Sequence, residues 1–167
     1  REILSYGVLH ADETPVAMLK PGNGKTHRAY LWAYAPGAFE DLRAVVYDFC
    51  ESRAGAHARS FLGPWQGALV CDDYVAYKQL FTQGIVEGGC MAHARRHLFE
   101  LHVNHQSQIA AQALRYIAQL YEIEREVKSL HAAERKTIGQ ATSRPLADAL
   151  HAWMVLQRQR ITDGSAT

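Results

Sequence analysis

The run YGVLHADETPVAML, from Tyr6 to Leu19, is followed by the turn sequence Pro21-Gly-Asn-Gly-Lys25 and by the aromatic run HRAYLWAY, from His27 to Tyr34. Short β-type runs separated by proline and glycine are typical of strands joined by tight turns. We therefore predict that the chain begins with two antiparallel strands. The run Ala44–Phe49 adds a third short strand, so the first part of the sheet is expected to be a meander.

Helices and strands are expected to alternate after the meander. The predicted elements are a helix in Ser52–Trp65, a buried strand at Ala68–Asp72, a helix at Tyr74–Phe81 and a fifth strand at Ile85–Cys90. A crossover through a helix is expected to be right-handed and to return the fourth strand parallel to the first. If the fourth strand lies beside the first, Asp12 and Asp72 face each other near the strand ends.

The sequence changes character towards its end. One helix is expected from Ala92 to about Val103, and no strand-like run occurs from Ser107 onward. Apolar residues then recur at steps of three and four, which is typical of a helix with one packed face. A break is expected around Gly139, after which Ser143 and Pro145 begin a second helix. The predicted domains are a sheet-containing core, residues 1–106, and a helical hairpin, residues 107–167.

The composition predicts a globular chain. Of 167 residues, 48% are apolar, and 18 basic against 17 acidic residues give a net charge of +1. This balance argues against tight non-specific DNA binding by the whole surface, because neutralising phosphates needs a basic surplus, but it allows a local basic patch. Three cysteines without a CxxC pair favour a reducing cytoplasm. No apolar run is long enough for a membrane span, so no membrane partner is predicted.

Two aspartates, Asp12 and Asp72, lie in strand-like runs, where a carboxylate is unfavourable. The simpler interpretation is that each faces water at a strand edge. Two carboxylates on neighbouring strands repel each other unless a cation lies between them, and Mg²⁺ prefers such oxygen ligands. Two metal ions can activate a water or a 3′-hydroxyl, so the pair suggests phosphodiester chemistry. Asp73 competes with Asp72, since strand neighbours face opposite sides, and the residues alone leave that choice open.

A second group of residues has the spacing C-x2-H-x3-H, formed by Cys90, His93 and His97. Cysteine and histidine are the usual zinc ligands, so a zinc site is one interpretation. The alternative is that Cys90 packs in the core while His93 makes a local hydrogen bond. Because no second cysteine pair supports zinc, we expect no zinc here.

Basic residues cluster at two places. Lys25 and Arg28 lie around the first hairpin, and Arg95 and Arg96 follow the histidine motif. Such groups suit contacts to DNA phosphates, and a solvated charged surface is the alternative interpretation.

Several segments, taken in order, resemble the transposases of the insertion sequence 66 family. They are Leu9–Val16 (LHADETPV), Tyr30–Trp32, Val46–Asp48, Ser52-Arg53, Leu69–Tyr74 (LVCDDY) with Tyr77, and Gly89–Arg96 (GCMAHARR). The match covers most of Leu9–Leu101 with family-like spacing. Each motif is weak by itself, but the ordered set is specific.

The resemblance implies an α/β, ribonuclease H-like mixed sheet, built from a three-strand meander plus parallel strands, with a DDE catalytic triad that uses Mg²⁺ or Mn²⁺. It implies a DNA transposase, which cleaves DNA and transfers strands in transposition and recombination. It places the first catalytic aspartate at Asp12 and the second at Asp72. It matches Cys90 and His93 to a signature that shapes the site. The implied partners are transposon-end and target DNA and further copies of the chain.

The sequence departs from the family pattern in two ways. The family's last catalytic glutamate lies in an Asn-Asn-x-x-Glu-Arg-like run that is absent here, and glycine usually stands where this chain has Asp73. The glutamates after residue 106 belong to a helical segment, which resembles the insertion that precedes that last glutamate. We therefore expect these 167 residues alone to be inactive in strand transfer. Two alternatives are another ribonuclease H-like nuclease and a non-catalytic transposon remnant that only contacts proteins.

Overall fold

The computed structural model describes residues 1–22 and 24–160. It divides into two compact units, Arg1–Cys90 and Met91–Thr167. The first unit is mixed α/β and the second is helical, and each is described by itself.

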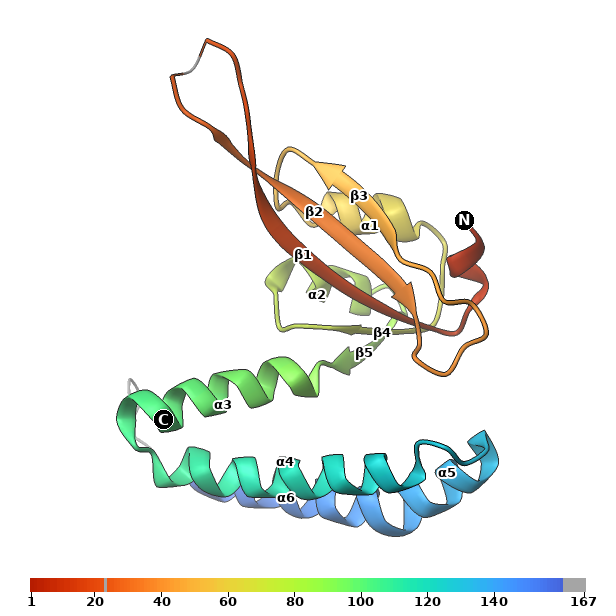
Figure 1. Cartoon of the computed structure of the whole chain (residues 1–167), viewed down its shortest axis with the longest axis vertical. Coiled ribbons are helices and arrows are strands. Elements are labelled where there is room, and N and C mark those ends of the chain that lie inside the picture. Colours follow the sequence, from red (N-terminus) through yellow and green to blue (C-terminus); the bar gives the residue numbers. More distant parts are fainter. Residues whose placement is uncertain (23, 161–167) are drawn as a thin grey trace. The chain divides into compact units, whose positions relative to one another are not determined.

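The first unit is built around a five-stranded mixed sheet (Figure 1). Its elements are the 3-10 turn η1 (Glu2–Ser5), β1 (Val8–Met18), β2 (His27–Pro36), β3 (Val46–Cys50), α1 (Ala56–Leu62), β4 (Ala68–Cys71), α2 (Val75–Phe81) and β5 (Val86–Gly89). The spatial order is β3-β2-β1-β4-β5. The first three strands are antiparallel neighbours, whereas β4 runs parallel to both β1 and β5. The predicted meander followed by parallel strands is confirmed.

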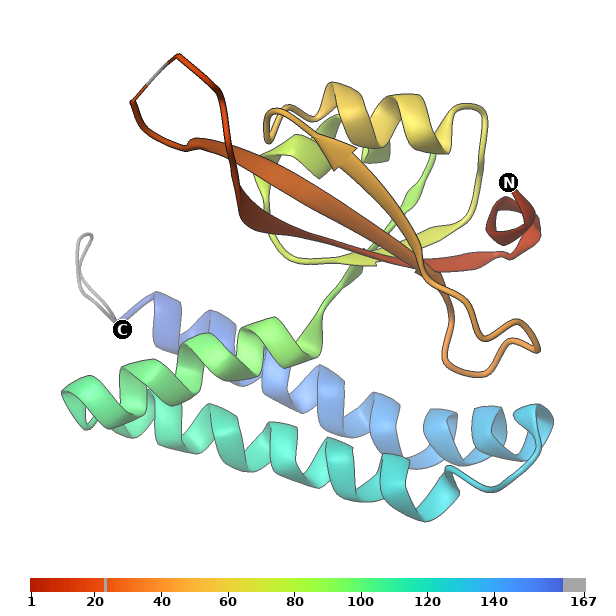
Figure 2. The same cartoon turned by 45° about the horizontal axis from the view of Figure 1, so that its top comes forward.

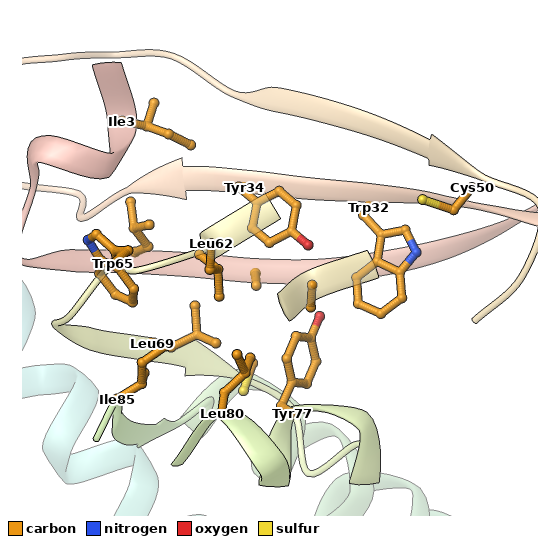
Figure 3. Packing of buried hydrophobic residues seen from close by; sticks show 14 residues of the cluster. Ile3, Trp32, Tyr34, Cys50, Leu62, Trp65, Leu69, Tyr77, Leu80 and Ile85 are labelled. Atoms are coloured by element: carbon orange, nitrogen blue, oxygen red, sulfur yellow. The ribbon is translucent and has the colours of Figure 1, made fainter. Parts of the chain in front are cut away.

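The core of this unit lies between one face of the sheet and helices α1 and α2 (Figures 2 and 3). Strand β1 alternates between buried and exposed residues, with Leu9 and Ala11 in the core. The ring of Tyr34 on β2 stacks on Phe61 of α1, with 3.9 Å between ring centroids. Because neighbouring strand residues face opposite sides, Asp12 lies on the sheet face away from this core.

The β1–β2 hairpin extends beyond its neighbours in the sheet (Figure 1). The two strands pair from Leu9↔Pro36 to Met18↔His27. Strand β4 pairs with β1 only as far as His10, and β3 pairs with β2 only from Tyr30. Residues 15–22 and 24–29 therefore project as a two-stranded ribbon, which we call the projecting ribbon. Gly22 and Gly24 in its turn have positive φ angles of +92° and +62°, which glycine adopts without strain.

The second unit consists of helices. They are α3 (Met91–His105), α4 (Gln108–Val127), α5 (Ala132–Ile138), the π-helical turn η2 (Gly139–Ser143) and α6 (Arg144–Arg158). Helix α4 begins where Ser107 Oγ accepts a hydrogen bond from the amide of Ala110, at 3.2 Å. Helices α4 and α6 run antiparallel and pack through Ile117 and Leu150, as expected for the hairpin (Figures 1 and 2). Among the helices of the described residues, each is too short or too polar to span a bilayer.

Two details of this unit differ from the sequence-based expectation. The expected domain boundary followed residue 106, whereas α3 lies in the helical unit, because its Leu98 packs on the core of α4 and α6. The expected break around Gly139 is wrong, since Gly139 has helical angles (φ −59°, ψ −39°) and η2 joins α5 to α6. The chain turns earlier, at His131, which forms a capping box with Glu134.

Candidate functional site

Asp12 and Asp72, the predicted metal ligands, both belong to the first unit. Asp12 lies in β1 and is exposed, whereas Asp72 follows the last residue of β4 and is half-buried. The parallel pairing of β1 with β4 ends at His10↔Val70. Continued by two residues, the same register sets Asp12 opposite Asp72, near the end of β4. This is the arrangement expected if the fourth strand lies beside the first.

The two aspartates after β4 have different surroundings. Oδ1 of Asp72 accepts a hydrogen bond from the amide of Tyr74 at 3.0 Å, which fixes the turn. Asp73 is exposed and pairs with Lys78 at 2.5 Å, and Lys78 also contacts Glu87 at 2.7 Å. The hydrogen bond from Lys78 lowers the pKa of Asp73. Because Lys78 already neutralises Asp73, Asp72 is the better candidate ligand.

The carboxylate oxygens of Asp12 and Asp72 suit a hard divalent cation such as Mg²⁺ or Mn²⁺. Within residues 1–22 and 24–160, no three or more His, Cys, Asp or Glu side chains are grouped to hold a metal ion. Of the helical glutamates, Glu122 pairs with Arg125 and Glu134 caps α5. The donor type therefore fits the metal, and the described residues supply two candidate carboxylate ligands, Asp12 and Asp72.

Cys90 lies at the same end of the sheet as Asp72. Its amide donates a hydrogen bond to the carbonyl of Cys71 at 2.9 Å, which places Cys90 beside the last residue of β4. Cys90 is a half-buried free thiol. Burial raises the pKa of the neighbouring Cys71 thiol to about 12, so that thiol stays protonated at neutral pH. His93 lies in the first turn of α3, in the helical unit.

The basic residues predicted to contact DNA are exposed. Lys25 and Arg28 lie on the projecting ribbon, and Arg95 and Arg96 lie on α3. No aspartate or glutamate occurs from residue 14 to residue 39, so the ribbon carries only positive charge. A surface of this kind suits contacts to a phosphate backbone.

A buried carboxylate that the sequence patterns did not reveal lies next to Asp12. The side chain of Glu13 is 1% exposed and faces the core. Arg53 donates from Nε to Oε1 of Glu13 at 2.8 Å and also contacts the same oxygen through Nη2. The hydroxyl of Tyr77 donates to Oε2 at 2.6 Å, and Figure 3 shows this hydroxyl directed towards the sheet. Burial, and then the bond to Glu13, raise the pKa of Tyr77.

Tyr74 connects this group to the turn after β4. Its hydroxyl donates to the carbonyl of Arg53 at 2.7 Å, and the guanidinium of Arg53 lies 3.6 Å from the centre of the Tyr74 ring. The rings of Tyr74 and Tyr77 meet edge to face. The contacts thus connect β1, the loop before α1 and the turn that contains Asp72. The alternation of faces along β1 could have predicted the burial of Glu13, because residue 13 lies on the same face as buried Leu9 and Ala11.

Comparison with known proteins gives a family and several relatives. The family described as "Transposase IS66 family" matches residues 1–167. An uncharacterized protein of Sinorhizobium fredii (strain NBRC 101917 / NGR234), y4qI, is 34% identical over 152 residues, which cover 84% of this chain and 28% of that protein. Another from the same strain, y4jD, is 32% identical over 98% of this chain and 34% of its own length. The chain spans about a third of the length of these relatives. No solved structure matches.

The pair formed by Arg53 and Glu13 gives a test of stability. Arg53→Ala leaves a buried carboxylate without its cation, which we expect to lower the free energy of unfolding by about 2–3 kcal/mol. This is below the usual loss for a buried pair, because the Arg53 side chain is 39% exposed and Tyr77 still binds Glu13. Urea denaturation measures it, with exposed Arg28→Ala as the control. Equal stability of the two variants would show that the pair does not hold the fold.

Proposed function

The chain belongs to the IS66 transposase family, and from this premise we propose that it takes part in DNA cleavage and strand transfer during transposition, in the cytoplasm. The observation that carries the proposal is the register of β1 and β4, which when continued sets Asp12 opposite Asp72. In this proposal the two carboxylates are the first two members of a DDE triad.

We assign the sheet to the ribonuclease H-like class, as the family resemblance implies. The assignment is supported by the order β3-β2-β1-β4-β5, in which three antiparallel strands are followed by two parallel ones. Helices α1 and α2 form the connections on either side of β4. In this class of fold we expect the helices from α4 onward to be an insertion before the last catalytic carboxylate.

In the proposed site, Asp12 and Asp72 would hold Mg²⁺ or Mn²⁺. When bound, such metal ions activate the attacking water or 3′-hydroxyl and stabilise the leaving oxygen. The chain itself orients the ligands, since the amide of Tyr74 fixes Oδ1 of Asp72. The exposed basic residues of the projecting ribbon, and separately those of α3, would bind DNA phosphates. Because an element has two ends to be cut, we expect two copies to act together.

Metal binding is the direct test of the two carboxylates. We expect Asp12→Asn and Asp72→Asn each to weaken Mn²⁺ binding by at least about tenfold, because each removes a charged oxygen ligand. Electron paramagnetic resonance of free Mn²⁺ in a titration of this chain measures the affinity. The matched control is Asp73→Asn, which is expected to bind Mn²⁺ like the unmodified chain. If Asp73→Asn weakens Mn²⁺ binding and Asp72→Asn does not, the metal ligand is Asp73 and not Asp72.

The basic residues are tested by DNA binding at several salt concentrations. We expect the double variant Lys25→Ala/Arg28→Ala to bind duplex DNA more weakly and to lower the salt slope by about 2, since two phosphate contacts are lost. Arg95→Ala/Arg96→Ala is expected to act in the same way. The control, Lys128→Ala/Arg144→Ala, removes the same charge from two exposed positions, one in the turn after α4 and one at the start of α6. Equal losses in all three variants would show only the effect of net charge on DNA binding.

The motif of Cys90 and His93 is expected to shape the site and to bind no zinc. Elemental analysis of protein purified without added metal should therefore find no stoichiometric zinc. Its control is the Cys90→Ala variant, which should have the same metal content. Stoichiometric zinc that disappears in Cys90→Ala would contradict this expectation.

A further inference from the structure

The pairing of β1 with β4 stops short of the candidate metal ligands. The last paired residues are His10 and Val70, two positions before Asp12 and Asp72. The backbone pairing therefore brings the two strands side by side but ends before the two carboxylates. Further contacts are needed to define their separation closely, because a metal ion that is shared by two ligands requires oxygen positions defined within a few tenths of an ångström.

The nearest such contact is made by the residue after Asp12. Glu13 is held at both carboxylate oxygens, by Arg53 at Oε1 and by the Tyr77 hydroxyl at Oε2. Arg53 precedes α1, and Tyr77 lies in α2, the helix that follows the Asp72 turn. Glu13 therefore connects β1 directly to the segment after β4.

A second path leads from Glu13 to Asp72 itself. Arg53 binds Glu13 and lies against the ring of Tyr74, whose hydroxyl donates to the Arg53 carbonyl. The amide of Tyr74 in turn donates to Oδ1 of Asp72. Together, the two paths form a closed set of contacts around the end of β4. At one end, Glu13 is the sequence neighbour of Asp12. At the other end, the amide of Tyr74 is hydrogen-bonded to Asp72.

We propose that four residues form a positioning cluster, which sets the separation and orientation of the Asp12 and Asp72 carboxylates for metal binding. The members of the cluster are Glu13, Arg53, Tyr74 and Tyr77. None of them needs to touch the metal ion. The cluster acts through the backbone of β1 and through the turn after β4. The inference rests on the proposed function, since it assumes that the two aspartates share a metal ion.

The choice of residues supports a positional role. A carboxylate buried to this degree is unfavourable unless it is paired and hydrogen-bonded, and well-packed apolar residues often stabilise a fold equally well. Apolar contacts, however, do not define a direction. Hydrogen bonds to both oxygens of Glu13 do, and each comes from a different segment of the chain.

The test is Mn²⁺ affinity in variants that leave every charge in place. Tyr77→Phe removes the hydroxyl that binds Glu13, and Tyr74→Phe removes the hydroxyl that binds the Arg53 carbonyl. We expect Tyr77→Phe to weaken Mn²⁺ binding by about tenfold, the low end of the loss when a direct partner of a metal ligand is removed, because Tyr77 acts on Asp12 only through Glu13. Tyr74→Phe is expected to weaken Mn²⁺ binding in the same direction. The matched control is Tyr34→Phe. Tyr34 is equally buried, and its hydroxyl makes no hydrogen bond within the described residues.

Hydrogen exchange of the Tyr74 amide gives a second readout that needs no metal. We expect faster exchange at Tyr74 in Tyr77→Phe than in Tyr34→Phe, because the turn is less well held. If Tyr77→Phe fails to fold, Tyr74→Phe carries both measurements, since its ring contact with Arg53 is kept.

The outcomes separate this inference from the proposed function. If Asp12→Asn loses Mn²⁺ binding while Tyr77→Phe and Tyr74→Phe match Tyr34→Phe, the positioning role is overturned and the metal site stands. If Asp12→Asn and Asp72→Asn bind Mn²⁺ like the unmodified chain, the proposed metal site itself fails, and the positioning role fails with it. Weaker Mn²⁺ binding in both tyrosine variants, with faster exchange of the Tyr74 amide in Tyr77→Phe than in Tyr34→Phe, supports the cluster.

Discussion

Strand β1 is hydrogen-bonded along both edges, antiparallel to β2 and parallel to β4. Because strand residues alternate between faces, this double pairing fixes the face on which each residue lies. Leu9, Ala11 and Glu13 face the core, and Asp12 lies on the opposite face. A slip of one residue would move the candidate metal ligand into the core and expose the apolar face. The proposed chemistry therefore depends on the register of this one strand.

The partners of β1 end at different positions, and this divides the strand into three parts. Residues 9 and 10 are paired on both sides, residues 11–14 carry the carboxylates, and residues 15–18 belong to the projecting ribbon. The ribbon and its turn carry Lys25 and Arg28 without any acidic residue. A chain with a net charge of only +1 can thus present a locally positive surface, since its acidic residues lie elsewhere.

The sequence was sufficient to predict the order of strands and helices in the first unit, because glycine and proline turns separate short apolar runs. It also predicted that β4 returns parallel to β1 and beside it, which followed from a crossover through a helix. It did not predict the burial of Glu13, because a glutamate in a strand is ordinarily solvated and its partner Arg53 is 40 residues away. It assigned α3 to the sheet domain, since the contact of Leu98 with later helices is long-range. The break expected at Gly139 is absent, because glycine only weakens a helix that tertiary contacts can retain.

The buried charge of Glu13 shows how stability and geometry are balanced near the candidate site. An apolar residue at position 13, with an apolar partner in place of Arg53, would bury more hydrophobic surface and would avoid desolvating a carboxylate. Such a core would hold β1 against α2 without defining how the turn after β4 is oriented. The hydrogen bonds to Glu13 are directional, and the strand carries Asp12 one residue away on the other face. Changes at Glu13 should therefore affect both the fold and the metal site, whereas changes at exposed Asp12 should affect the metal site alone. The two faces of one strand thus separate the candidate metal ligand, Asp12, from Glu13, the residue proposed to position it.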